Sequence, residues 1–163
     1  MARSAAFTAA AILLCAALQF SVTHWLRIAG VEPDLLLVVT VVIALLSGPR
    51  AGMAIGFSAG VIEGALLGRG IGVYAAAKTV AGYIAGVAGG RLFAENLIVT
   101  MVATAVVTLV HEGIVGIFTP GAGMGRIIAL AAGQGAYNAG VALIVGAALR
   151  RARRWLPPEE QRA

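Results

Sequence analysis

Long apolar stretches, interrupted by short polar or glycine-containing breaks, run along nearly the whole chain. They cover residues 5–26, 35–47, 51–67, 71–89, 97–118 and 127–149. A helix that crosses a bilayer needs about 20 apolar residues, within a range of about 17–25. The pattern therefore predicts an all-α fold: a polytopic membrane helical bundle with six transmembrane helices.

The second stretch, residues 35–47, is shorter than a usual membrane span. It could form a thin helix, a tilted helix assisted by local thinning of the bilayer, or half of a re-entrant hairpin with residues 51–67. We favour six spans, with four spans and a hairpin as the alternative. Both numbers are even, so both arrangements place the two termini on the same side of the membrane.

Composition also indicates a membrane protein. Hydrophobic residues make up 60% of the chain and charged residues 12%, whereas soluble domains carry about 25% charged residues. The net charge is +5, but the basic residues flank the apolar stretches instead of forming one patch. This distribution indicates orientation in lipid and predicts no nucleic-acid partner. Cys15 is the single cysteine, which excludes an intrachain disulfide and a cysteine-based metal cluster.

The basic residues predict the orientation as well. One side carries Arg3, Arg50, Arg91, Arg150, Arg151, Arg153 and Arg154, and the other carries Arg27, Arg69 and Arg126. Because the side richer in arginine and lysine faces the cytoplasm, we expect both termini to be cytoplasmic. Residues 1–156 then form a single transmembrane domain in the bacterial inner membrane, and residues 157–163 form a short cytoplasmic tail.

Glycines recur at four-residue spacing in two of the predicted helices. The first row consists of Gly52, Gly56, Gly60, Gly64 and Gly68, and the second of Gly82, Gly86 and Gly90. Glycine is unfavourable in a soluble helix, but between membrane helices it allows the backbones to approach closely. The two rows therefore predict close helix–helix packing.

Two charged residues lie within the predicted spans near these rows. An ionised group at the centre of a membrane costs about 2.5–3.5 kcal/mol on insertion scales, which makes Glu63 and Lys78 exceptional. At 1.5 Å rise per residue, they lie about 8 and 12 Å below the loop that joins their helices. They can therefore meet, and we expect a structural ion pair, with a ligand-facing role as the alternative.

The last two stretches add further polar groups. Five residues of the fifth stretch recur at four-residue spacing: Thr100, Thr104, Thr108, Glu112 and Gly116. The sixth stretch contains Gln134, Tyr137 and Asn138. Such a row drifts by about 40° per step and so winds around its helix. Two interpretations remain open: hydrogen bonds between helices, or a polar pocket formed by Glu63, Lys78, Glu112, Gln134 and Asn138.

Catalytic motifs are incomplete. His111 and Glu112 begin the zinc motif H-E-x-x-H, but Val115 occupies the position of the second histidine. Ala77 stands before Lys78, where a phosphate-binding loop requires glycine. We therefore expect no enzymatic activity, no metal and no cofactor.

A set of short motifs carries a family resemblance. It comprises Pro33-Asp34-Leu35-Leu36-Leu37, Gly48-Pro49-Arg50-Ala51-Gly52, Gly56-Phe57, Gly60, Glu63-Gly64, Leu66-Leu67, Gly72, Ala75-Ala76, Gly82-Tyr83, Gly86 and Arg91-Leu92-Phe93. Over residues 31–118 this set resembles the family of the rod-shape-determining protein MreD. The family usually has aspartate near Gly64, where this chain has Glu63, and Lys78 is also unusual there.

The resemblance implies a non-enzymatic inner-membrane subunit, surrounded by membrane lipid, that partners MreC. It would work with the MreB filament, the RodA glycosyltransferase and its penicillin-binding partner. A six-helix arrangement similar to the substrate-binding subunits of energy-coupling-factor vitamin transporters is also implied. The leading hypothesis is a scaffold for rod shape and side-wall peptidoglycan synthesis, and the alternative is a solute-binding subunit of such a transporter.

Overall fold

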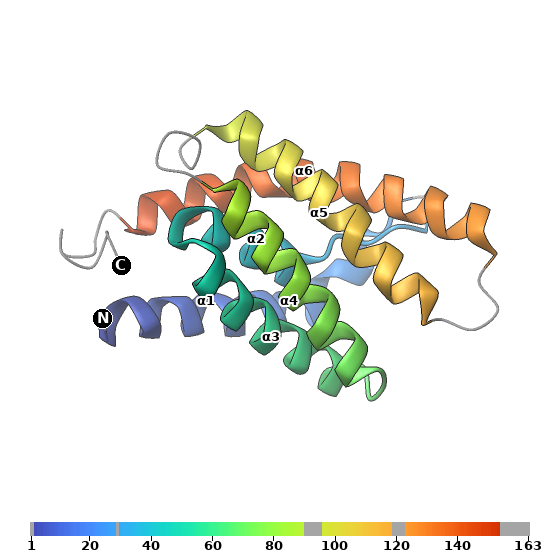
Figure 1. Cartoon of the computed structure of the whole chain (residues 1–163), viewed down its shortest axis with the longest axis horizontal. Helices are drawn as coiled ribbons and strands as arrows, with labels where there is room; N and C mark the ends of the chain where they lie inside the picture. The colour runs from blue at the N-terminus through green and yellow to red at the C-terminus, as the bar shows by residue number, and fades with distance from the viewer. Residues whose placement is uncertain (1, 29, 90–95, 119–122, 154–163) are drawn as a thin grey trace.

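The computed structural model describes residues 2–28, 30–89, 96–118 and 123–153 (Figure 1). Within these ranges the α-helices are α1 Ala2–Val22, α2 Leu35–Ser47, α3 Pro49–Leu66, α4 Ile71–Ala88, α5 Leu97–Ile117 and α6 Met124–Arg153. A short 3-10 helix, η1 Thr23–Leu26, follows α1, and no strand is formed in the same ranges. The predicted all-α class is confirmed.

The helices begin and end within a few residues of the predicted apolar stretches. The first differs at its end, because α1 stops at Val22 and the chain continues into η1. Three helices, α4, α5 and α6, are long and apolar enough to cross a membrane, whereas the number of six spans stays a prediction. The beginning of α1 and the end of α6 lie at the same end of the bundle (Figure 1). The predicted tail, residues 157–163, lies outside the described residues.

Helix α2 lies at the centre of the bundle, where it contacts all five other helices. Every residue from position 36 to position 45 is buried. At 1.5 Å rise per residue, its 13 residues span about 20 Å, which is less than the thickness of the hydrocarbon core of a bilayer, about 30 Å. Because helices rather than lipid surround α2, its length does not have to match the bilayer.

The glycine rows lie at the contact between α3 and α4. A Cβ atom placed on Gly60 would lie 2.6 Å from the Cα atom of Ala75, a distance too short for any side chain. The same kind of overlap with backbone atoms occurs at Gly52, Gly56, Gly64, Gly82 and Gly86. The two helices therefore touch through their backbones, which only glycine permits at these positions.

Two members of the rows differ. Gly68 follows the end of α3, has a φ of +66°, and would meet nothing within 4 Å of an added Cβ. The prediction of a packing contact at Gly68 is therefore wrong, because the helix has already ended and the glycine serves the left-handed turn. Gly90 lies outside the described residues.

Candidate functional site

The polar groups of the bundle converge on Asp34. This residue is the N-cap of α2, and its Oδ1 atom accepts a 2.8 Å hydrogen bond from the backbone N–H of Leu37. An aspartate suits this position because the first N–H groups of a helix have no partner within the helix. Since α2 begins inside the bundle, the cap brings a carboxylate into the interior, and Asp34 is only 2% exposed.

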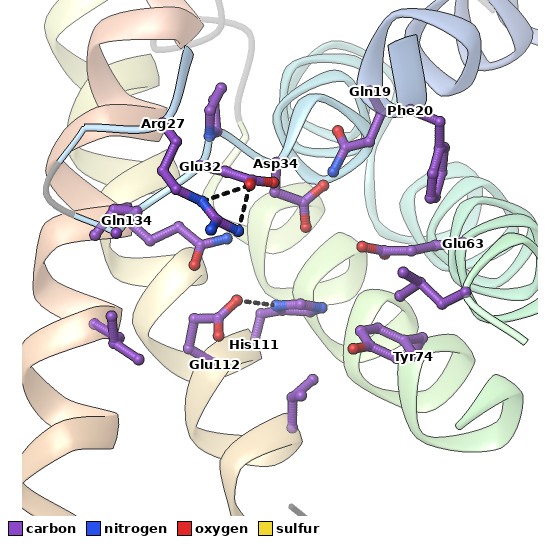
Figure 2. Close-up of a pocket in the computed structure, with 16 residues that line it drawn as sticks. Gln19, Phe20, Arg27, Glu32, Asp34, Glu63, Tyr74, His111, Glu112 and Gln134 are labelled. Atoms are coloured by element: carbon purple, nitrogen blue, oxygen red, sulfur yellow. Dashed lines mark hydrogen bonds and ion pairs between the residues drawn. The ribbon is translucent and has the colours of Figure 1, made fainter. Parts of the chain in front are cut away.

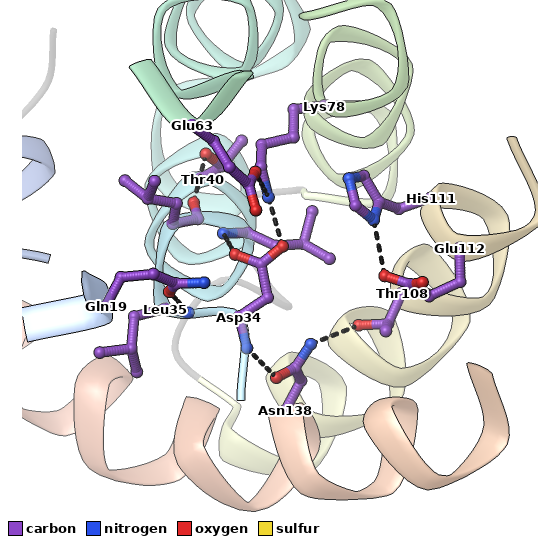
Figure 3. Close-up of polar contacts among 12 residues, drawn as sticks. Gln19, Asp34, Leu35, Thr40, Glu63, Lys78, Thr108, His111, Glu112 and Asn138 are labelled. Carbon is purple, nitrogen blue, oxygen red and sulfur yellow. Dashed lines mark hydrogen bonds and ion pairs between the residues drawn. The ribbon is translucent and has the colours of Figure 1, made fainter. Parts of the chain in front are cut away.

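Lys78, on α4, provides the positive charge beside this carboxylate. Its ammonium group forms an ion pair with Asp34 Oδ2 and lies 2.9 Å from Oε2 of Glu63 on α3. The lysine side chain is fully buried and the two carboxylates are nearly so. The structure thus contains a Glu63–Lys78 ion pair together with a second carboxylate, that of Asp34, which the sequence pattern did not place there (Figure 3).

Hydrogen bonds connect the beginning of α2 to the other helices (Figure 3). The Asp34 backbone N–H donates to Asn138 Oδ1 on α6 at 2.9 Å, and Asn138 Nδ2 donates to Thr108 Oγ1 on α5 at 3.2 Å. From α1, Gln19 Oε1 accepts a 2.6 Å hydrogen bond from the backbone N–H of Leu35. Polar contacts at this one point therefore join α2 directly to α1, α4 and α6, and through Lys78 and Asn138 to α3 and α5.

The threonine row of α5 has bonds both within and between helices. Thr104 and Thr108 each donate a 2.7 Å hydrogen bond to the carbonyl oxygen four residues earlier. Thr108 also accepts from Asn138, and Thr100 accepts a 2.5 Å hydrogen bond from Arg150 on α6. Thr100 and Thr108 therefore contribute to the α5–α6 contact, and the three threonines are not among the residues that line the cavity beside the ion pairs.

A cavity of about 450 Å³ lies beside the ion pairs, between α1, α3, α4, α5, α6 and the segment that precedes α2 (Figure 2). Glu63, Glu112 and Gln134 are among the residues that line it. Lys78 and Asn138 are fully buried in the polar network and do not line it. Of the five residues of the expected pocket, three therefore line the cavity and two are buried in the interior.

His111, on α5, brings an imidazole to the same cavity. Its side chain is 2% exposed, and its Nδ1 atom lies 3.1 Å from Oε1 of Glu112. Its Nε2 atom has no hydrogen-bond partner among the described residues. One potential ligand atom from each of Asp34, Glu63 and His111 lies within 4.8 Å of the other two. Two carboxylates and an imidazole are groups that exchange protons and bind cations.

Asp34 and His111 are the site residues that sequence reasoning missed. An aspartate directly before an apolar run is an N-cap signal, so the capping role of Asp34 was accessible from the sequence, but its burial was not. His111 lies three residues after Thr108, which places both on one side of the helix. That spacing, rather than the incomplete zinc motif, was the signal available for His111.

Comparison with known proteins identifies one family. A family profile described as rod shape-determining protein MreD matches residues 1–147, a range that includes every residue that lines the cavity. No curated protein and no solved structure matches the chain, and the expected likeness to energy-coupling-factor subunits stays a prediction. On the strength of the profile match, the chain belongs to the rod shape-determining protein MreD family.

Proposed function

We propose that the protein is a non-enzymatic scaffold subunit of the bacterial cell-wall elongation complex in the inner membrane. In this role it binds MreC and supports rod shape and side-wall peptidoglycan synthesis, together with MreB, RodA and its penicillin-binding partner. The observation that carries the proposal is the family match over residues 1–147, since members of this family determine rod shape.

The packing of the bundle supports a scaffold role. A scaffold has to hold its outer surfaces in fixed relative positions while other proteins bind to them. Here the backbone contact of α3 with α4 and the ion pairs of Lys78 fix the inner helices. Large apolar side chains such as Phe57 and Ile144 remain exposed on the outside, where lipid or the transmembrane helix of a partner can cover them.

The proposed orientation assigns the cavity to the periplasmic side. Phe20 at the end of α1 and Leu130 near the beginning of α6 both line the cavity. It therefore lies toward the end of the bundle opposite to the start of α1 and the end of α6. With cytoplasmic termini, as the arginine distribution predicts, this end faces the periplasm.

Depletion in a rod-forming host tests the proposal. Loss of the protein should turn rods into rounded cells, and purification of the tagged protein in mild detergent should recover MreC. A matched pair of complementing variants provides the control: Gly72→Leu, at a position with open space around it, should restore rods, whereas Gly60→Leu should not. Normal rods after complete depletion, or wild-type preparations that lack MreC, contradict the proposal.

The cavity favours the solute-binding subunit as a second candidate. Its volume of about 450 Å³ lies within the range of small-molecule sites, about 300–1,000 Å³. Mass spectrometry of gently purified protein would detect a retained solute and co-purified ATPase subunits. Recovery of both favours this second function, and recovery of MreC without them favours the scaffold.

A further inference from the structure

We propose that the base of the cavity binds a divalent metal ion through Asp34, Glu63 and His111, with Zn²⁺ as the ion to test. The site goes beyond the scaffold role, which does not require it, so either proposal can fail without the other. It also departs from the expectation of no metal that the incomplete H-E-x-x-H motif suggested. The three ligands come from the cap of α2, from α3 and from α5 instead of from one helix.

The three side chains are close enough to share an ion. Their nearest ligand atoms lie within 4.8 Å of one another. Bonds from Zn²⁺ to nitrogen or carboxylate oxygen measure about 2.0–2.2 Å, so in the tetrahedral geometry that Zn²⁺ prefers two ligands of one ion lie about 3.3–3.6 Å apart. Side-chain movements of about 1 Å therefore convert the present arrangement into a coordination site. Figure 2 shows Glu63, Asp34 and His111 facing the same space from different helices.

The charges around this space favour a cation. Three carboxylates, those of Asp34, Glu63 and Glu112, share the region with one ammonium group, that of Lys78. Arg27 does not change this balance, since it pairs with Glu32 at 2.6 Å. Uncompensated charges inside a protein are strongly unfavourable. One divalent ion would restore neutrality.

His111 provides a second observation that is independent of the carboxylates. Its Nε2 atom is buried and has no hydrogen-bond partner among the described residues. A hydrogen bond between Nδ1 and Glu112 holds the ring, with Glu112 Oε1 3.1 Å away. Metal-binding histidines commonly donate their other ring N–H to a carboxylate, which leaves the free nitrogen directed at the ion. With the proton on Nδ1, His111 and Glu112 have this arrangement.

Lys78 competes with the metal for the same carboxylates. Its ammonium group contacts both Asp34 and Glu63. A metal ion that binds there has to share these oxygens with a fixed positive charge, which lowers its affinity. The cavity, which all three ligands line, gives the ion access and leaves room for water at its remaining coordination positions.

The first test measures Zn²⁺ binding to the full chain, purified in detergent without a histidine tag and treated with a chelator. Isothermal titration calorimetry should show one ion per chain. The variants His111→Ala and His111→Gln should weaken binding by about tenfold or more. His24→Ala, which removes the other histidine of the sequence, should leave the affinity unchanged. Absence of binding, or wild-type affinity in both His111 variants, overturns the proposal.

X-ray absorption of the wild-type protein with bound Zn²⁺ keeps the test independent of variants that fold poorly. The spectrum should contain one imidazole and otherwise oxygen ligands. A spectrum without imidazole, or with the sulfur of Cys15 as a ligand, overturns the proposal.

Replacement of Lys78 separates this site from adventitious binding. Lys78→Met removes the competing ammonium group while Asp34, Glu63 and His111 remain. Zn²⁺ affinity should therefore rise about tenfold or more, and Zn²⁺ should raise the melting temperature of this variant more than that of the wild type. Unchanged affinity in a folded Lys78→Met protein would show that the ion binds elsewhere and would overturn the proposal.

Discussion

The α3–α4 and α5–α6 hairpins are both rich in glycine, but their glycines do different things. In the first hairpin, a Cβ atom on Gly60 would lie 2.6 Å from the Cα atom of Ala75. In the second, the nearest approach of a helical glycine to the partner backbone is looser, with a Cβ on Gly135 lying 3.3 Å from the Ala105 carbonyl oxygen. Gly113 and Gly140 would meet nothing within 4 Å. Regular four-residue spacing accompanies the backbone contact, and irregular spacing accompanies the looser one.

The comparison indicates that one half of the bundle is fixed by its backbone and the other by its side chains. Glu63 and Lys78 belong to the tightly packed hairpin, whereas His111 and Asn138 belong to the looser one. Asp34, between them at the beginning of α2, contacts both. The polar network therefore joins two halves that tolerate substitutions differently. The effects of substitutions on stability should differ between the halves in size and in sign.

The largest effect is expected at the tight contact. Gly60→Leu should prevent the approach of α3 to α4, because the new side chain would occupy the position of the α4 backbone. Folded protein recovered by size-exclusion chromatography in detergent should fall sharply. Gly72→Leu, in the same hairpin but with open space around it, should elute as the wild type does. Equal recovery of the two variants would show that the backbones are not in contact.

Next in size is the loss of the buried positive charge. Lys78→Met leaves Asp34 and Glu63 facing each other without their ammonium partner, and it should lower the free energy of unfolding by about 3–5 kcal/mol. SDS-titrated unfolding of metal-free protein measures this change. Arg27→Met breaks an exposed ion pair instead and should change the same quantity by about 0–1 kcal/mol. Similar values for both variants would mean that water reaches Lys78.

A smaller effect is expected for the connection between the two halves. Asn138→Ala removes the hydrogen bonds to Asp34 and Thr108. Because hydrogen bonds between membrane helices contribute about 0.6 kcal/mol each, the loss should be about 1–2 kcal/mol. Gln134→Ala, which shortens a cavity-lining side chain on the same helix, should cost less in the same SDS titration. A larger loss for Gln134→Ala would place the connection in the cavity wall rather than at Asn138.

Local patterns carried the information on the helix limits and on the glycine contacts. Apolar stretches end at turn residues such as Gly48, which has a φ of +87°, and so the helix limits follow from the chain itself. The glycines from Gly52 to Gly64 similarly mark their own contact, because each lies on nearly the same side of the helix as the glycine four residues before it. Both signals depend on neighbours within about one or two turns.

Features that depend on long-range packing could not be predicted from the sequence. An apolar stretch of 13 residues has the same pattern whether it is a thin span or a central helix, so the position of α2 was not accessible. The burial of Asp34 follows from that position, and its partner Asn138 is 104 residues away. The polar-pocket interpretation named Glu63, Glu112 and Gln134, which line the cavity, but not Asp34 and His111, which line it as well. The positions of Asp34 and His111 at the cavity depend on which helices surround α2.

The smallest effect has the opposite sign and tests the looser half directly. Gly140→Ala adds a methyl group where an added Cβ would meet nothing within 4 Å, and alanine restricts the unfolded chain more than glycine does. The free energy of unfolding should therefore rise by about 0.4–1 kcal/mol. The same substitution at Gly60 should lower it, because there the methyl group would overlap the α4 backbone. Thiol-reactive dye melting curves, which use Cys15 as the single reporter, can detect shifts of both signs. If Gly140→Ala destabilises the protein as much as Gly60→Ala does, α6 is packed as tightly as α3, and the distinction between the two hairpins does not hold.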